Sequence, residues 1–236
     1  MKLVTWNCQG AFRKKLEFVL KQCPDILIVQ ECEHPDKLIY DSAIPKPNDV
    51  LWFGDNKNKG LGVFSYSDYK FELVEQYNEN IKTILPILVT GGAYDFMLFA
   101  IWANNRLDPD GQYIEQVWKA VNHYTELLKG ENIILIGDFN SNKIWDKKHR
   151  AGNHSAVVQK LLENNIHSAY HLKHGQEQGV EDKPTFFLQR NVNKPYHIDY
   201  CFLSNSLYEK VTDLEIGKYD DWITYSDHMP LTINFK

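Results

Sequence analysis

Five short groups of acid, amide and histidine residues follow one another along the chain, and their side chains can bind metal ions and transfer protons. They are Thr5-Trp6-Asn7, Gln30-Glu31, Gly137-Asp138-Phe139-Asn140, His197-Ile198-Asp199-Tyr200 and Ser226-Asp227-His228. At least four of these groups stand where an apolar, strand-like run stops. Strand ends on a rigid sheet hold side chains with the small tolerance that catalysis needs. If these ends meet at one edge, hard oxygen ligands and proton-transferring groups would form a magnesium-dependent site that cleaves phosphate esters.

The group Gly137-Asp138-Phe139-Asn140 follows the apolar run of residues 133–136. Gly137 allows a tight backbone turn, and Asn140 lies two residues beyond Asp138, on the same side of an extended chain. A carboxylate and an amide so placed can hold a water molecule between them, because the carboxylate takes a proton while the amide fixes the direction of the water. The alternative is an Asx turn at a strand end without a chemical role.

The other groups also contain candidate site residues. Asp227 and His228 stand just before an apolar run, and the alternative for His228 is an ordinary hydrogen-bonded loop histidine. Asp199 lies within an aromatic and apolar stretch, where an unpaired carboxylate would cost several kcal/mol to bury and a histidine partner would satisfy it. Glu31 and Asn7 are candidate metal ligands, and the alternative for both is a solvated strand end.

The apolar pattern predicts the elements that must position these residues. The first segment should form a strand over residues 2–6, a helix over 12–22 and a strand over 26–29 that is buried on both faces. Further strands are expected over 51–54, 61–66, 71–74, 87–89 and 96–102, since turn residues separate these runs.

The first pattern then returns, because the strand over 96–102 leads into a helix over 112–128 and a strand over 133–136. A helix over 155–164 and strands over 198–203 and 231–235 would complete this second half. We therefore expect an α/β fold with two mixed β-sheets packed face to face and helices outside. No linker divides the chain, so residues 1–236 should form a single domain.

Composition narrows the possible functions. With 43% hydrophobic residues in 236, the chain can build a sizeable core. A formal net charge of −5 argues against a strongly basic protein that wraps nucleic acid, although a metal site would neutralise several of the carboxylates. Cys8, Cys23, Cys32 and Cys201 lack zinc-site spacing and are expected to be buried free thiols in a reducing compartment. No signal-peptide core or membrane-length apolar run occurs, so the expected location is cytoplasmic.

Taken together, the five groups resemble the endonuclease/exonuclease/phosphatase superfamily, which includes exonuclease III, apurinic endonucleases, DNase I, inositol-polyphosphate 5-phosphatases and neutral sphingomyelinases. The resemblance runs from Trp6 to Pro230, with all five motifs in the family order. It implies a DNase I-like fold, a four-layer α/β sandwich, in agreement with the two expected sheets.

The resemblance also implies a role for each candidate residue. Glu31 would bind Mg²⁺, for which Mn²⁺ can substitute, and Asn7 and Asp227 would lie near the ion. Asp138 would orient or deprotonate the attacking water, and Asn140 would position water and phosphate.

On the same resemblance, His228 would contact the scissile phosphate, and Asp199 would orient His228 as a carboxylate does in a catalytic triad. Two positions depart from the apurinic endonucleases. Where those enzymes carry a tyrosine that touches phosphate, this chain has Trp102, with Asn104 close behind, and Gln9 stands where they often have an acid. These departures weigh against cleavage at apurinic sites, and Trp102 and Asn104 become candidate substrate contacts.

A basic run follows Asn140 and consists of Lys143, Lys147, Lys148, His149 and Arg150, with Trp145 among them. Lys147, Lys148 and Arg150 are candidate contacts to phosphates that flank the cleaved bond, and Trp145 is a candidate for stacking on a base. The alternative is an ordinary solvated loop.

The sequence therefore predicts a magnesium-dependent phosphodiesterase that hydrolyses DNA by water attack, as an endonuclease or a 3′-exonuclease. The stretch from Tyr196 to Ser204 resembles the nuclease branch of the superfamily most. Two alternatives stay open: a phosphatase or phosphodiesterase of a small-molecule or lipid phosphate ester, and a catalytically silent binding module. The expected partner is a nucleic acid substrate, DNA, without a membrane or an obligate protein partner.

Overall fold

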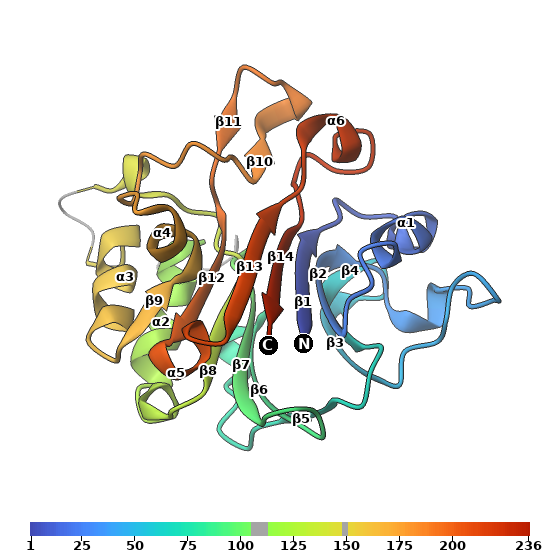
Figure 1. Cartoon of the computed structure of the whole chain (residues 1–236), viewed down its shortest axis with the longest axis horizontal. Coiled ribbons are helices and arrows are strands. Elements are labelled where there is room, and N and C mark those ends of the chain that lie inside the picture. The colour runs from blue at the N-terminus through green and yellow to red at the C-terminus, as the bar shows by residue number, and fades with distance from the viewer. Residues whose placement is uncertain (105–112, 148–150) are drawn as a thin grey trace.

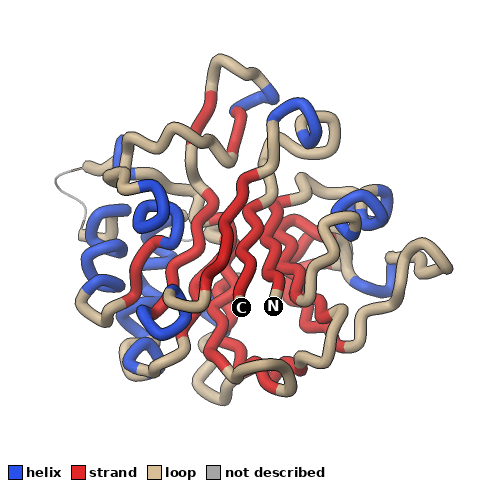
Figure 2. The backbone as a smooth tube through the Cα atoms, in the orientation of Figure 1, coloured by secondary structure: helices blue, strands red, loops and turns tan. Residues whose placement is uncertain are grey.

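Two mixed β-sheets lie face to face in the computed structural model, and helices cover the outer side of each sheet (Figure 1). The structure describes residues 1–104, 113–147 and 151–236. Figure 2 shows the strands gathered in the middle and the helices on both flanks. The predicted fold class, an α/β sandwich of four layers, is confirmed.

The strand order shows how the chain is divided between the sheets. The first sheet has the order β13 (Val211–Ile216), β14 (Leu231–Phe235), β1 (Lys2–Asn7), β2 (Ile26–Cys32), β4 (Lys59–Ser65) and β3 (Asp49–Asn56). The second has the order β5 (Lys70–Leu73), β6 (Ile84–Thr90), β7 (Phe96–Trp102), β8 (Ile133–Asp138), β12 (Asp199–Ser204) and β9 (Ile166–Ser168). The parallel pairs β1–β2 and β7–β8 occupy equivalent central places, as the repeated sequence pattern predicts.

One expected assignment is wrong. Residues 231–235 form β14, which pairs antiparallel with β1 in the first sheet and does not complete the second half. The chain thus ends beside its own beginning, and the two termini lie next to each other in Figure 1. This pairing matters for the site, because it carries Asp227 and His228 from the far end of the chain to the end of β1.

Alternation along the strands separates the inner core from the two outer cores. The inner faces of both sheets share one core, whose central strands contribute Leu3, Ile26, Ile28, Leu98, Ala100, Ile134, Ile136, Cys201 and Leu203. The intervening residues face outward and pack against helices. Burial of one such aliphatic side chain contributes about 2 kcal/mol, so this packing is the main force that holds the layers together.

The outer layers differ in size. On the second sheet, α2 (Ile114–His123) and α3 (His154–Leu162) bury an apolar side against β7, β8 and β12. On the first sheet, the predicted helix over 12–22 is broken at Lys15, whose backbone is not helical, into a 3₁₀ turn (Phe12–Lys14) and α1 (Leu16–Leu20). The helix expected over 112–128 ends at His123, and position 112 lies outside the described residues.

Smaller elements complete the layers. The short helices α4 (Ala169–His174), α5 (Asn205–Tyr208) and α6 (Tyr219–Trp222) flank the sheets, and a two-stranded hairpin, β10 (Phe186–Phe187) and β11 (Pro195–Tyr196), stands above one sheet edge (Figure 1). Among the described residues, no helix combines the length and the apolar composition that a bilayer crossing requires. The four cysteines are free, as expected, but Cys23 is exposed and not buried.

A buried histidine lies just before β12 of the second sheet. The Nδ1 atom of His197 donates a hydrogen bond to the carbonyl oxygen of Lys183 at 2.7 Å, and its ring packs on Tyr170 with centroids 4.5 Å apart. Burial lowers the pKa of His197 to about 4. The neutral form is therefore the one that the fold accommodates.

This burial predicts a loss of stability in acid. Between pH 6.5 and 4 the unfolded chain binds a proton at this position and the folded chain does not, so the free energy of unfolding should fall as the pH falls, by roughly 2–3 kcal/mol from His197 alone. Urea denaturation at pH 7.5 and 4.5 measures the loss. His197→Asn, which keeps a donor for Lys183, should lose less free energy of unfolding between these pH values than the wild type. His123→Asn, at an exposed position, should lose as much as the wild type. Equal losses in all three proteins would show that the low pKa of His197 is not the cause.

Candidate active site

The inner-facing rows of the central strands change from apolar to polar side chains at the same edge of the sandwich. Leu3 and Thr5 lead to Asn7 on β1, and Ile134 and Ile136 lead to Asp138 on β8. Asp199 begins β12 directly opposite Asp138 in the antiparallel register. The sheet packing thus brings together residues that are far apart in the sequence.

Asp138 is fully buried and accepts hydrogen bonds from both sheets. Its Oδ2 accepts from Asn7 Nδ2 and from Asn140 Nδ2, each at 2.9 Å, and its Oδ1 accepts from the Asn140 backbone N–H at 2.8 Å. Asn140 also donates to the carbonyl oxygen of Ala103 at 3.0 Å. Burial raises the pKa of Asp138 to about 7, and of the neighbouring charges His228 opposes this rise and Asp199 adds to it. A carboxyl group with this pKa can exchange a proton near neutral pH.

Backbone conformations that most residues avoid accompany this group. Gly137 has a φ of +140°, and a Cβ at this position would collide with the carbonyl oxygen of Ile101 in β7. Glu31 has a φ of 61° and lies at a bulge of β2, which continues past it to Cys32. The bulge moves Glu31 out of the buried row, so its carboxylate is partly exposed. Left-handed conformations of non-glycine residues cost energy and often mark functional sites.

Asp199 and His228 form a buried pair. The Nδ1 atom of His228 lies 2.9 Å from Asp199 Oδ2, and the histidine partner of Asp199 is therefore His228 and not its sequence neighbour His197. Burial alone would lower the pKa of His228, but the charge and the hydrogen bond of Asp199 raise it to about 10. The imidazole is thus protonated at neutral pH and carries a positive charge.

Thr185, which the sequence patterns missed, binds the backbone next to both residues of this pair. Its Oγ1 accepts the backbone N–H groups of Ile198 and Asp199, both at 3.0 Å. Its carbonyl oxygen accepts the N–H of Met229 at 2.7 Å, next to His228. One fully buried residue therefore fixes the backbone on both sides of the Asp199–His228 contact.

Two sets of residues can be compared as metal ligands. Among the described residues, ligand atoms of Asp138, Asp199 and His228 lie within 4.8 Å of one another and form an acidic group that could accept a cation. A protonated imidazole is not a metal ligand, however, so His228 fits a contact to phosphate better.

Glu31, Asn7 and Asp227 offer two carboxylates and an amide oxygen, which fit a hard divalent cation. Burial raises the pKa of Asp227, and the charge of Glu31 contributes to the rise. A cation between the two carboxylates would relieve this repulsion. Gln9, which the sequence marked only as a departure from the apurinic endonucleases, donates its Nε2 to Asp227 Oδ2 at 2.8 Å. Arg190, which the sequence missed, donates its Nη2 to Gln9 Oε1 at 2.5 Å.

The candidate substrate contacts lie on two sides of this centre. Trp102 ends β7 beside Asp138 and is only 5% exposed, and the Asn104 side chain borders a neighbouring cavity. Lys147 is exposed on the loop after the 3₁₀ turn Lys143–Trp145. Lys148 and Arg150 lie outside the described residues.

A row of aromatic rings leads from the surface to His228. Trp145 is 47% exposed, and its ring centroid lies 5.0 Å from that of Tyr196. Tyr196 lies 6.4 Å from Phe186, and Phe186 lies 4.6 Å from His228. Such a row offers aromatic surface beside the positively charged imidazole.

Comparison with known proteins agrees with this geometry. Residues 4–228 match the model of the Endonuclease/Exonuclease/phosphatase family, whereas no curated protein matches the chain. A 3′ phosphatase from Neisseria, NExo, solved with a product DNA hairpin, has a TM-score of 0.69 and 20% identity over 100% of this chain and 99% of that one. An AP endonuclease from Archaeoglobus fulgidus has a TM-score of 0.65 and 17% identity over 100% of this chain and 99% of its own.

A third structure with this fold is the endonuclease domain of TRAS1, a telomere-specific non-LTR retrotransposon. Its TM-score is 0.63 and its identity 19%, over 100% of this chain and 97% of that domain. At these identities the solved structures establish the fold, while the family model covers nearly the whole sequence. This protein belongs to the Endonuclease/Exonuclease/phosphatase family and is a hydrolase of phosphoric esters.

Proposed function

We propose that the protein is a magnesium-dependent phosphodiesterase that hydrolyses DNA by attack of water on phosphorus. The observation that carries the proposal is the convergence of three kinds of group at one sheet edge. Asp138 is a buried carboxylate with a pKa near 7, and His228 is a buried imidazolium held by Asp199. Glu31 and Asp227 add a carboxylate pair beside them.

Asp138 is the group best placed to take a proton from the attacking water. Its carboxylate is fixed by Asn7 and Asn140, so its orientation is set before substrate arrives. A pKa of about 7 lets it accept a proton during attack and release it afterwards at neutral pH. Asn140 is the residue that would direct water and phosphate.

His228 is the group that would stabilise charge on the phosphate. With Nδ1 bound to Asp199, its Nε2–H is left to donate to a phosphate oxygen. A charge-assisted hydrogen bond of this kind strengthens as negative charge develops, and it gains further in a buried site. Thr185 keeps the pair in register.

Glu31, Asp227 and Asn7 are the residues that would hold Mg²⁺ or Mn²⁺. When bound, such an ion polarises a phosphoryl oxygen and neutralises its charge. The arrangement of Gln9 and Arg190 beside Asp227 would fix the orientation of that carboxylate.

Two observations favour nucleic acid over a small or lipid phosphate ester. The aromatic row from Trp145 to Phe186 offers a stacking surface for bases, and Lys147 adds positive charge at its outer end. The solved relatives include a 3′ phosphatase bound to a DNA hairpin and an AP endonuclease. A silent binding module is disfavoured because all the expected acids are present.

Substrate comparison tests this proposal. The purified protein should cleave short DNA duplexes or their 3′ ends with Mg²⁺ and should lose activity with EDTA. Inositol phosphates and choline phosphodiesters should be cleaved far more slowly. Preference for either small ester would replace DNA by that substrate class. RNA is the second nucleic acid in the series, and preference for it would replace DNA by RNA.

A first prediction concerns the metal ligand. Glu31→Gln should weaken Mg²⁺ binding and lower DNA cleavage by about two orders of magnitude or more, because a hard cation prefers a carboxylate to an amide. Calorimetric titration and initial rates measure both effects, and thermal unfolding controls for the fold. Wild-type Mg²⁺ dependence in this variant would rule Glu31 out as the ligand.

A second prediction concerns the residue behind the Asp199–His228 pair. Thr185→Val leaves two buried N–H groups without an acceptor, so it should cost roughly 1–3 kcal/mol of stability and lower kcat about tenfold. Thr185→Ser keeps the hydroxyl and is the matched control. It should retain most of the stability and most of the kcat. If Val and Ser variants had equal kcat, the hydroxyl would not position the pair.

A further inference from the structure

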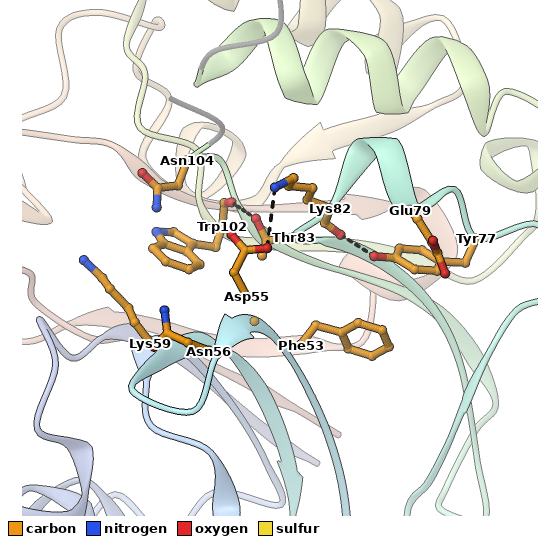
Figure 3. Close-up of a pocket in the computed structure, with 11 residues that line it drawn as sticks. Phe53, Asp55, Asn56, Lys59, Tyr77, Glu79, Lys82, Thr83, Trp102 and Asn104 are labelled. Atoms are coloured by element: carbon orange, nitrogen blue, oxygen red, sulfur yellow. Dashed lines mark hydrogen bonds and ion pairs between the residues drawn. The ribbon is translucent and has the colours of Figure 1, made fainter. Parts of the chain in front are cut away.

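A cavity of about 460 Å³ opens beside Lys59, which contacts the candidate metal ligand Glu31. It lies between the β3–β4 hairpin and the segment that joins β5 to β6 (Figure 3). The rings of Phe53 and Tyr77 form one wall, with centroids 5.4 Å apart. Among the described residues, the charged groups that line it are the ammonium groups of Lys59 and Lys82 and the carboxylates of Asp55 and Glu79.

Lys59 connects this cavity to the active centre. Its Nζ lies 2.9 Å from Glu31 Oε2 and 5.6 Å from the centre of the Trp102 ring. The Lys59 side chain is 46% exposed and that of Glu31 is 21% exposed. Lys82 lies farther along the cavity, 3.5 Å from Asp55 (Figure 3).

The ion pair between Lys59 and Glu31 competes with the proposed role of Glu31. A divalent cation on this carboxylate would stand next to the ammonium group, and like charges at such a distance repel. Lys59 must then leave Glu31. Its long stem can turn while its head stays over the Trp102 ring, which attracts a cation.

Once released, the Lys59 ammonium would lack its carboxylate while still lining the cavity. A phosphate diester next to the scissile one would supply the missing anion, and the attached base or sugar could lie against Phe53 and Tyr77. Because Lys82 is paired with Asp55, Lys59 is the group that would meet the phosphate, and an ammonium group beside an aromatic wall suits a nucleotide better than an uncharged apolar ligand.

Building on the proposed function, we propose that this cavity is a subsite for the nucleotide that flanks the scissile phosphate on the Glu31 side. Lys59 is its phosphate contact and is the counter-ion of Glu31 until a divalent cation binds. Lys59 therefore opposes metal binding and favours substrate binding.

The first experiment uses Mg²⁺ alone, without substrate. Lys59→Gln should bind Mg²⁺ about two- to fivefold more tightly than the wild type in calorimetric titration, as expected for loss of a half-exposed competing ion pair. Lys57→Gln is the matched control, because it removes the same charge from the same hairpin. Lys57 pairs with Asp36 and not with Glu31. Unchanged or weaker Mg²⁺ binding by Lys59→Gln would overturn the proposal that Lys59 competes with the cation for Glu31.

The second experiment uses a DNA duplex. Lys59→Gln should raise KM for DNA about tenfold and flatten the slope of log affinity against log salt by about one, since one phosphate contact is lost. Cleavage of a small chromogenic phosphodiester, too short to reach the cavity, should keep its KM. Lys57→Gln should match the wild type in both assays.

The two failures can be told apart. If the wild type cleaves DNA and Lys59→Gln keeps its KM and salt slope, the subsite is wrong and the proposed function stands. If the wild type cleaves no DNA while Mg²⁺ binding is intact, the proposed function is wrong, and the nucleotide subsite falls with it.

Discussion

The hydrogen bond from Asn7 Nδ2 to Asp138 Oδ2, 2.9 Å long, joins the two sheets at the edge where their shared apolar core stops. Below it, inner-facing aliphatic residues hold the sheets together by burial. Above it, polar side chains from both sheets face the same space. The position of every other group in the site depends on this packing, because β1 delivers Asn7 and β8 delivers Asp138. Gln30 reinforces the junction, since its Nε2 donates to Thr5 Oγ1 within the first sheet and to the Ile101 carbonyl oxygen of the second sheet.

Burial then sets the chemistry of the groups that the packing gathers. Asp138 and Asp199 face each other across antiparallel strands, and the charge of Asp199 raises the cost of ionising Asp138. A positive group relieves this cost, and His228 supplies it from the segment before β14. The same logic applies at the neighbouring carboxylates, where Glu31 and Asp227 would share a cation. Strained backbone at Glu31 and Asn140 is tolerated because the surrounding sheets fix these positions.

Much of this arrangement is predictable from sequence because it follows strand periodicity. Alternation places Asn7, Asp138 and Asp199 at the ends of inward-facing rows, and the repeated pattern predicts two similar sheets. Periodicity does not report strand partners, so residues 231–235 were expected in the wrong sheet. The break at Lys15 also escaped prediction, because apolar spacing continues through it.

Residues on irregular segments, or with roles that depend on contacts across sheets, could not be predicted. Thr185 lies in a loop and Arg190 in a short 3₁₀ turn, neither with an apolar period, and only the fold brings them to the site. Lys59 opens β4, and its contact with Glu31 arises because β2 and β4 are neighbours. A loop without apolar periodicity gives no information in its sequence about the residues that it contacts in the fold.

Asp199, from the second sheet, and His228, from the segment before β14 of the first sheet, are expected to act as one unit at a shared site. A double-mutant cycle on kcat for DNA measures this coupling, with Asp199→Asn, His228→Ala and the double variant compared with the wild type. Each single change should cost nearly as much as both together, because residues that act as a unit are not additive. Losses in log kcat that simply add would show that the two groups work separately and would rule out this coupling.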